Sequence, residues 1–152
     1  MLGITLPANL LRVETECRRL GAEGARVRLC VGSYPAGRAV SHVTEHDKAL
    51  ALVRCLRILM ESRAYPMLAT HDPRIIELAQ ELALRNGRGP ESFEYQMFHG
   101  VRPLEQRRLA DIGLRCRTYI PFGPGWYGYL ATRMAARPRI LFSYARALLD
   151  KR

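Results

Sequence analysis

Short apolar segments of strand length alternate along the chain with segments whose apolar residues recur every three or four positions. This pattern predicts five strands, each followed by an amphipathic helix. The strands are expected at residues 2–6, 27–31, 65–69, 93–98 and 116–122. The helices are expected at residues 10–20, 45–60, 73–85, 103–112 and 123–136, with a last helix at 140–150. The alternation predicts an α/β protein built from parallel βα units.

Two architectures fit this alternation, namely an open doubly wound sheet and part of a (β/α)8 barrel. A complete barrel takes about 250 residues, and the chain has 152, so only a partial barrel of about five strand–helix units is possible. We expect one domain over residues 1–152. In either architecture ligands bind at the C-terminal ends of the strands. The polar residues near those ends are Thr70, His71, Gln96 and Tyr119.

Polar side chains at two of the predicted strands, 65–69 and 27–31, can be interpreted either as ligand-binding or as structural residues. Thr70-His71-Asp72-Pro73 places a hydroxyl, an imidazole and a carboxylate directly before a helix. The helix N-terminus there would receive a phosphate or an anionic ring edge. Alternatively, Asp72 is simply the N-cap and His71 an interior polar group. Arg28 lies in an otherwise apolar strand, where it needs an anionic partner or a ligand if it is buried, or reaches solvent from an edge strand.

The segment after the last predicted strand offers a third group of candidates. Arg133 lies about two turns into the predicted helix after Tyr119. Its guanidinium would either hold a carboxylate through two parallel hydrogen bonds or face solvent. Trp126, Tyr127 and Tyr129 either cover an apolar ligand ring or belong to the core.

Other motifs give weaker signals. Residues 42–46 match H-x-x-E-H, a zinc pattern that needs a third ligand downstream. No obvious third ligand follows, so we predict no metal site. The sequence contains neither G-x-G-x-x-G after a strand nor G-K-[ST], which argues against Rossmann and P-loop nucleotide binding.

Composition and charge narrow the class of protein. Apolar residues make up 48% and charged residues 25%, which is typical of a globular protein and argues against a disordered or fibrous one. The net charge is +10, and twenty-two of the twenty-four basic residues are arginine. These arginines are spread along the chain among acidic residues, so we expect solvated helix faces and no nucleic-acid partner, although polyanions would bind non-specifically.

The compartment follows from what the sequence lacks. The four cysteines are far apart, the first residues do not resemble a signal peptide, and no apolar run approaches the length of a membrane span. We therefore expect reduced thiols and a location in the cytoplasm or at the inner face of a membrane.

Six motifs occur in order over more than a hundred residues. They are residues 28–34, 65–72, 93–97, 117–123, 126–129 and 137–138. Together they resemble the proline dehydrogenase family, flavoenzymes that oxidise L-proline to 1-pyrroline-5-carboxylate. The resemblance runs from about Ile4 to Leu149. It implies a distorted (β/α)8 barrel with FAD at the C-terminal strand ends, of which this chain is similar to the last five strand–helix units.

The resemblance also implies roles for individual residues. Arg28 matches an arginine at the reactive edge of the isoalloxazine, where a cation favours negative charge on the reduced flavin. Tyr119 matches a tyrosine beside the substrate, and Arg133 the second of two adjacent arginines that bind the proline carboxylate. The residues expected to bind the cofactor are Arg28, Cys30, Val31, Gly32, Thr70 and His71. Those expected to bind substrate are Tyr129, Thr132 and Arg133.

Four positions depart from the family pattern. Pro7 replaces a flavin-contacting glutamine, and Val31 replaces a cofactor-binding lysine. Thr132 replaces the first of the two arginines that bind the carboxylate, and Ala136 replaces an acidic residue. Losing half of a bidentate carboxylate site costs about 2–4 kcal/mol of binding. A lysine and an aspartate of the family's earlier strands have no counterpart here.

The expected function is therefore FAD-dependent proline oxidation, with hydride transfer to flavin N5 and electrons passing on to a quinone or another membrane-linked acceptor. Five strands of an eight-stranded barrel leave unpaired edges. A fragment carrying the missing strands, or self-association, is thus an expected partner. The alternatives are a catalytically inactive truncated remnant and a basic module that binds polyanions.

Overall fold

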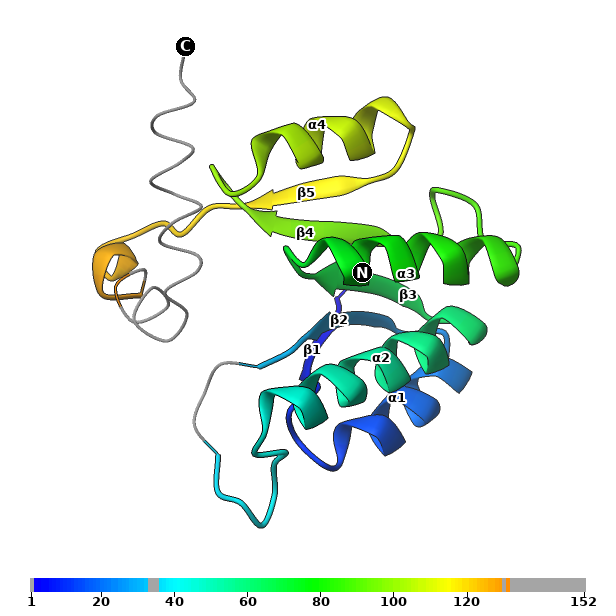
Figure 1. Cartoon of the computed structure of the whole chain (residues 1–152), viewed down its shortest axis with the longest axis vertical. Helices are drawn as coiled ribbons and strands as arrows, with labels where there is room; N and C mark the ends of the chain where they lie inside the picture. The colour runs from blue at the N-terminus through cyan, green and yellow to red at the C-terminus, as the bar shows by residue number, and fades with distance from the viewer. Residues whose placement is uncertain (1, 33–35, 130, 132–152) are drawn as a thin grey trace.

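The structure, a computed structural model, describes residues 2–32, 36–129 and 131. Strands and helices alternate through most of this range (Figure 1). The strands are β1 (Ile4–Pro7), β2 (Arg26–Cys30), β3 (Tyr65–Ala69), β4 (Glu94–Phe98) and β5 (Cys116–Tyr119). The helices are α1 (Val13–Ala22), α2 (Glu45–Glu61), α3 (Pro73–Arg85) and α4 (Pro103–Asp111).

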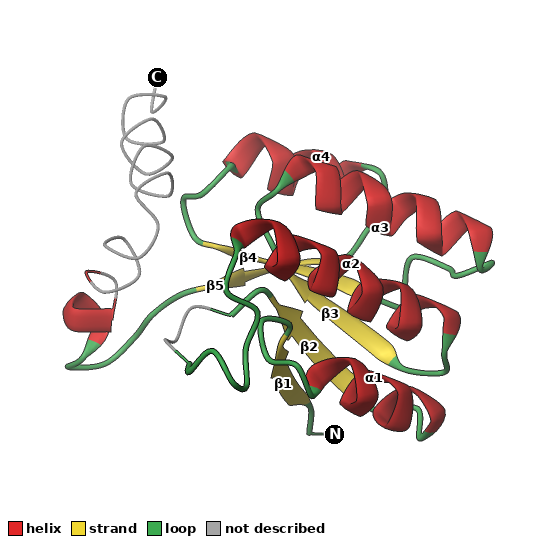
Figure 2. Cartoon of the chain, turned by 60° about the horizontal axis from the view of Figure 1, so that its bottom comes forward, coloured by secondary structure: helices red, strands yellow, loops and turns green. Residues whose placement is uncertain are grey.

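The five strands form one parallel sheet in the order β1-β2-β3-β4-β5. Each strand therefore pairs with the next one in the sequence, and α1 to α4 lie on one side of the sheet (Figure 2). A doubly wound sheet reverses its strand order and carries helices on both faces, so that alternative is wrong. The chain forms consecutive strand–helix units of a TIM-like (β/α)8 barrel.

The alternation within the strands explains the two faces of the sheet. In β2, Val27 and Leu29 are buried toward the helices, while the residues between them are only partly buried. β3 repeats the pattern with Pro66 and Leu68. The helix-facing strand residues pack against apolar side chains of α1, α2 and α3, such as Leu56. Burying one large aliphatic side chain contributes about 1.5–3 kcal/mol, so this face holds the core.

The predicted elements up to β5 are present, with shifted ends. β5 stops at Tyr119 instead of residue 122, because its partner β4 ends at Phe98, which is in register with Tyr119. β1 lies at Ile4–Pro7 because its pairing with β2 begins at Ile4. α1 begins at Val13 and not at residue 10, because Leu10 and Leu11 pair with the segment before α2: the Leu11 N–H donates to the Val40 carbonyl, and Leu10 forms a bridge with Ser41.

The end of the chain gives a partial test. Residues 126–129 are helical, as predicted for the start of the helix at 123–136. The rest of that helix lies largely outside the described residues, and the helix predicted at 140–150 lies wholly outside them. Among the helices of the described part, none combines the length and apolar character needed to cross a membrane.

Arg88 stabilises the end of the sheet where β3 and β4 begin. It follows α3, and its part-buried guanidinium donates hydrogen bonds to five backbone carbonyls. The acceptors are Leu59 (3.0 Å), Met60 (2.6 Å), Ser62, Ala64 (3.1 Å) and Ser92 (3.3 Å). Desolvation lowers the pKa of Arg88. This side chain joins the end of α2 to the segments that lead into β3 and β4.

Candidate functional site

The face of the sheet opposite the helices carries Arg28, in the middle of β2. Its Nε donates to Oε1 of Gln96 on β4 at 2.7 Å, across the intervening strand. In the intervening strand β3, Met67 is in register with Arg28 and Ala69 with Gln96. Because β2 lies between β1 and β3, the interpretation of Arg28 as an edge-strand residue is wrong. Its side-chain partner is a neutral amide and not an anion, so of the two partners predicted for a buried Arg28 the ligand stays a prediction.

Glu94 is the anion of this face, one step further along the same hydrogen-bond chain. It is fully buried, and its carboxylate accepts from Gln96 at 2.9 Å, from Tyr65 at 3.1 Å and from Arg117 at 2.8 Å. Arg26 lies 3.8 Å away. Burial by itself would raise the pKa of Glu94, but these hydrogen bonds and the nearby Arg117 charge lower it. The carboxylate is therefore ionised at neutral pH.

An aromatic group lies next to Arg28, where β4 and β5 end. The Tyr119 ring packs edge-on against Phe98 at 5.2 Å between centroids. The ring of Tyr129 lies 6.3 Å from Tyr119. The guanidinium carbon of Arg28 is 5.9 Å from the centre of the Tyr119 ring. The structure thus brings three predicted site residues, Arg28, Tyr119 and Tyr129, to one place.

Thr70 and His71 follow β3 and make local contacts. Thr70 is buried, and its hydroxyl oxygen accepts from the Asp72 backbone N–H at 3.1 Å. Nε2 of His71 accepts from the backbone N–H of Phe98 at 2.9 Å, and the two rings stack. Because Nε2 accepts, a neutral imidazole carries its proton on Nδ1. Asp72 caps α3 by accepting from the Arg74 N–H at 3.0 Å, which confirms the predicted N-cap.

The residues after Arg28 lie against the end of β1. The carbonyls of Cys30 and Val31 accept from backbone N–H groups of the β1 segment, at 2.7 and 2.9 Å. Gly32 has a φ of +94°, and a Cβ at this position would overlap the Asn9 side chain. Glycine is therefore required here both by conformation and by the close approach of Asn9. Pro7 lies in register with Cys30.

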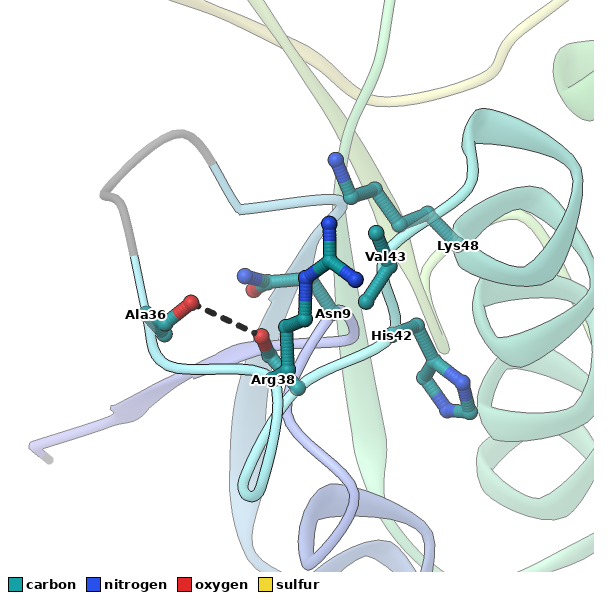
Figure 3. A pocket seen from close by; sticks show the side chains of 7 residues that line it. Asn9, Ala36, Arg38, His42, Val43 and Lys48 are labelled. Atoms are coloured by element: carbon teal, nitrogen blue, oxygen red, sulfur yellow. Dashed lines mark hydrogen bonds between the residues drawn. The ribbon is translucent and has the colours of Figure 1, made fainter.

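A cavity of about 260 Å³ lies at this end of β1, beside the loop that leads into α2. Its lining residues are Asn9, Ala36, Arg38, Ser41, His42, Val43 and Lys48. Figure 3 shows the Asn9, Arg38 and Lys48 side chains directed toward one region, with His42 pointing toward α2. The wall is cationic, and Lys48 also pairs with Glu45 at 2.7 Å.

The H-x-x-E-H segment spans the start of α2. His42 precedes the N-cap Thr44, whereas Glu45 and His46 form the exposed first turn of the helix. Within the described ranges no three His, Cys, Asp or Glu side chains gather in a way that could hold a metal ion.

Sequence reasoning missed the group around Glu94. The available signal was the two-residue period of strands, which puts alternate residues on one face. Polar side chains occur at such alternate positions in three strand regions. They are Arg26 and Arg28, Glu94 and Gln96, and Arg115 and Arg117. Since these strands lie in one parallel sheet, the pairs share the face that has no helix.

Comparison with known proteins decides the family. The family described as Proline dehydrogenase matches residues 43–133, more than half of the chain. The chain belongs to the proline dehydrogenase family. The match includes Thr70, His71 and Tyr119 and extends to Thr132 and Arg133, which lie outside the described residues, as does Ala136.

Curated relatives agree with this family. Proline dehydrogenase 1 of Bacillus subtilis (strain 168) is 31% identical over 150 residues, which are 99% of this chain and 50% of the relative. Proline dehydrogenase of Deinococcus radiodurans is 32% identical over 138 residues, 91% of this chain and 44% of the relative. The chain therefore spans about half the length of the curated proline dehydrogenases that it matches.

Solved structures support the fold. Proline utilization A from Bdellovibrio bacteriovorus aligns with a TM-score of 0.77 at 24% identity, over 87% of this chain and 16% of that chain. The protein of the same name from Bradyrhizobium japonicum aligns with a TM-score of 0.74 at 23% identity, over 98% of this chain and 18% of that chain. This chain of the proline dehydrogenase family thus has the fold of one part of those larger chains.

Proposed function

We propose that this chain forms the flavin- and substrate-binding part of an FAD-dependent proline dehydrogenase that oxidises L-proline to 1-pyrroline-5-carboxylate. The observation that carries the proposal is the convergence of Arg28, Tyr119 and Tyr129 at the C-terminal strand ends, where TIM-like barrels bind their ligands. Relatives that are named proline dehydrogenase and are 31–32% identical support it. Because the chain spans about half of those relatives, the activity is proposed for the assembled barrel.

The residues on the open face suit a flavin ring. Such a ring is planar and apolar on its faces, and it carries acceptors that become more negative on reduction. Tyr119 and Phe98 provide aromatic surface, and Arg28 provides a guanidinium whose Nε is held by Gln96. When bound, FAD would supply the acceptor for the two electrons removed from the C–N bond of proline.

Arg28 would act on the cofactor by its charge. Its bond to Gln96 uses Nε, and within the described residues the two Nη amino groups make no hydrogen bond. A guanidinium held next to the ring system stabilises negative charge that develops during reduction. Thr70, His71 and the stretch Cys30, Val31 and Gly32 would form the walls that keep the cofactor at the strand ends.

Tyr119 and Tyr129 would orient the substrate. Tyr119 is 41% exposed, so its ring is accessible from the open face. Its position between Arg28 and Tyr129 suits a residue that shapes a small apolar ring such as that of proline. We assign the proline carboxylate to Arg133, with Thr132 in place of a second cation.

The assembled enzyme needs further components. We propose that strands from another fragment, or from a second copy, pair with the outer edges of β1 and β5 and close the barrel. A quinone or another membrane-linked acceptor would then take the electrons. The locations proposed for this protein are the cytoplasm and the inner face of a membrane.

An inactive remnant is the second candidate. Pro7 and Val31 favour it, because neither side chain offers a hydrogen-bond donor at the cofactor side of the sheet. Such a protein would fold as described without retaining FAD.

The test is the visible absorption of the purified chain after incubation with FAD and desalting. Retained flavin bands support the proposal. The Arg28→Met variant should lose these bands. The control variant Arg57→Met should keep them, because Arg57 is on the exposed side of α2. Adding proline together with the part of Bacillus subtilis proline dehydrogenase 1 that this chain does not match should bleach the bands. A colourless protein, with or without that part, would favour the inactive remnant.

A further inference from the structure

A buried carboxylate is connected to Arg28 by two consecutive hydrogen bonds on the open face of the sheet. Nε2 of Gln96 donates to Glu94 at 2.9 Å, and Oε1 of Gln96 accepts from Nε of Arg28 at 2.7 Å. We infer that Glu94 is a positioning residue, which fixes the amide of Gln96 and thereby holds the guanidinium of Arg28 in place for its ligand. The part that concerns FAD rests on the proposed function.

The chemistry of the Gln96 amide gives these two hydrogen bonds a fixed direction. An amide has one accepting and one donating end, whereas a carboxylate only accepts and a guanidinium only donates. If the Gln96 amide were turned over, its oxygen would face Glu94 and its NH₂ group would face Arg28. Both contacts would then be repulsive. The charge on Glu94 therefore selects the one amide orientation that accepts a hydrogen bond from Arg28.

The surroundings of Glu94 keep it charged and rigid. Arg26 of β2, Tyr65 of β3, Gln96 of β4 and Arg117 of β5 all face its carboxylate. Arg115 donates to the hydroxyl of Tyr65 at 2.8 Å and so supports one of these partners. Residues of the four strands β2, β3, β4 and β5 thus surround the single carboxylate of Glu94. A side chain fixed from four strands is a firm base from which to orient Gln96.

A purely structural role for Glu94 makes a different prediction. Glu94 would then only balance the positive charges of Arg26 and Arg117, and Arg28 would be insensitive to its loss. The exchange rate of the Arg28 Nε proton with water separates the two roles. This rate reports whether the hydrogen bond from Arg28 to Gln96 is formed.

The experiment is hydrogen exchange by NMR on the full chain with isotope-labelled arginine, where the Arg28 Nε–H signal is the one missing in Arg28→Lys. Glu94→Gln should accelerate exchange of this proton about tenfold, as expected when a hydrogen bond to a charged group is weakened. Glu14→Gln is the matched control, since Glu14 likewise lies beside two arginines, accepting from Arg18 at 2.6 Å and from Arg54 at 3.0 Å, but is in the helical layer. It should leave the Arg28 signal unchanged.

A double variant tests the route through Gln96. Gln96→Leu should accelerate the Arg28 exchange on its own, and adding Glu94→Gln should then change it no further. If Glu94→Gln does not fold, an acid titration of the unmodified chain replaces it. The Gln96 amide and the Arg28 Nε–H signals should move together, with a midpoint below the ordinary glutamate value of 4.5.

The result for FAD is read separately, from quenching of flavin fluorescence. Glu94→Gln should weaken FAD binding about tenfold, and Glu14→Gln should not weaken it. An Arg28 signal that ignores Glu94→Gln would overturn the inference. If the exchange responds as expected but the unmodified chain binds no FAD, the proposed function fails while the link from Glu94 to Arg28 stands.

Discussion

Two arginines that contact the sheet are used in different ways. Arg88, where β3 and β4 begin, donates to five backbone carbonyls from three segments of the chain. Arg28, on the open face, donates to one side-chain oxygen. Both guanidinium groups are part-buried, so both differ from the solvated helix faces that composition and charge predicted. The difference is how many of the five N–H donors of the group the fold already uses.

This difference separates stability from function. A guanidinium whose donors are satisfied by main-chain oxygens stabilises the fold and cannot take a ligand without losing those bonds. A guanidinium that donates to one neutral amide still has N–H donors with which it can bind a ligand. Barrel folds show the same division, since their N-terminal strand ends serve stability and their C-terminal ends serve chemistry.

Replacing Arg88 should have the largest effect on stability. Arg88→Met keeps most of the aliphatic length but leaves several part-buried carbonyls without donors, which should lower the free energy of unfolding by about 3 kcal/mol. Arg85→Met is the control, because Arg85 is on the exposed end of α3 and pairs with the exposed Glu81. Urea denaturation of both variants at neutral pH measures the difference. Equal stability of the two variants would contradict a structural role for Arg88.

Glu94 should contribute stability that depends on pH. Its pKa is lowered in the folded chain, so its contribution is fully present above its ordinary value and is lost as pH falls through the folded value. At neutral pH, Glu94→Gln should cost about 1–2 kcal/mol. The difference in free energy of unfolding between the variant and the unmodified chain should narrow below pH 4.5, the ordinary pKa of a glutamate. Urea denaturation at a series of pH values checks it, and a gap that stays constant would show that the charge of Glu94 does not matter.

Asp72 tests whether every polar residue near the C-terminal strand ends contributes to the proposed site. It is adjacent to His71, yet its carboxylate caps α3 by accepting from the Arg74 backbone N–H, and its pKa is lowered mainly by the side-chain hydrogen bonds from the Arg74 guanidinium. Asp72→Ala should therefore cost about 1 kcal/mol of stability and leave FAD retention unchanged. Glu77→Ala, on the exposed side of the same helix, should cost less. Loss of FAD from a folded Asp72→Ala protein would assign Asp72 to the site.

The sequence was sufficient for the order of elements because each strand buries alternate residues and each helix buries a stripe. The two-residue spacing of Val27 and Leu29, for example, predicts β2. It was not sufficient for strand ends such as Tyr119, which depend on where the neighbouring strand stops. Nor did it reveal the partner of Arg28, because Gln96 is two strands and sixty-eight positions away. Contacts of that kind follow from register, which local patterns do not specify.

Arg28→Met should have the smallest effect on stability, and so provides the sharpest test of the comparison with Arg88. The variant loses one hydrogen bond, and Gln96 keeps its other bond to Glu94, so the free energy of unfolding should change by about 0.5 kcal/mol. Its effect should appear instead in FAD retention, measured on the same samples after desalting. If Arg28→Met were as unstable as Arg88→Met, Arg28 would be a second structural arginine, and the number of unused donors would not distinguish ligand-binding side chains in this fold.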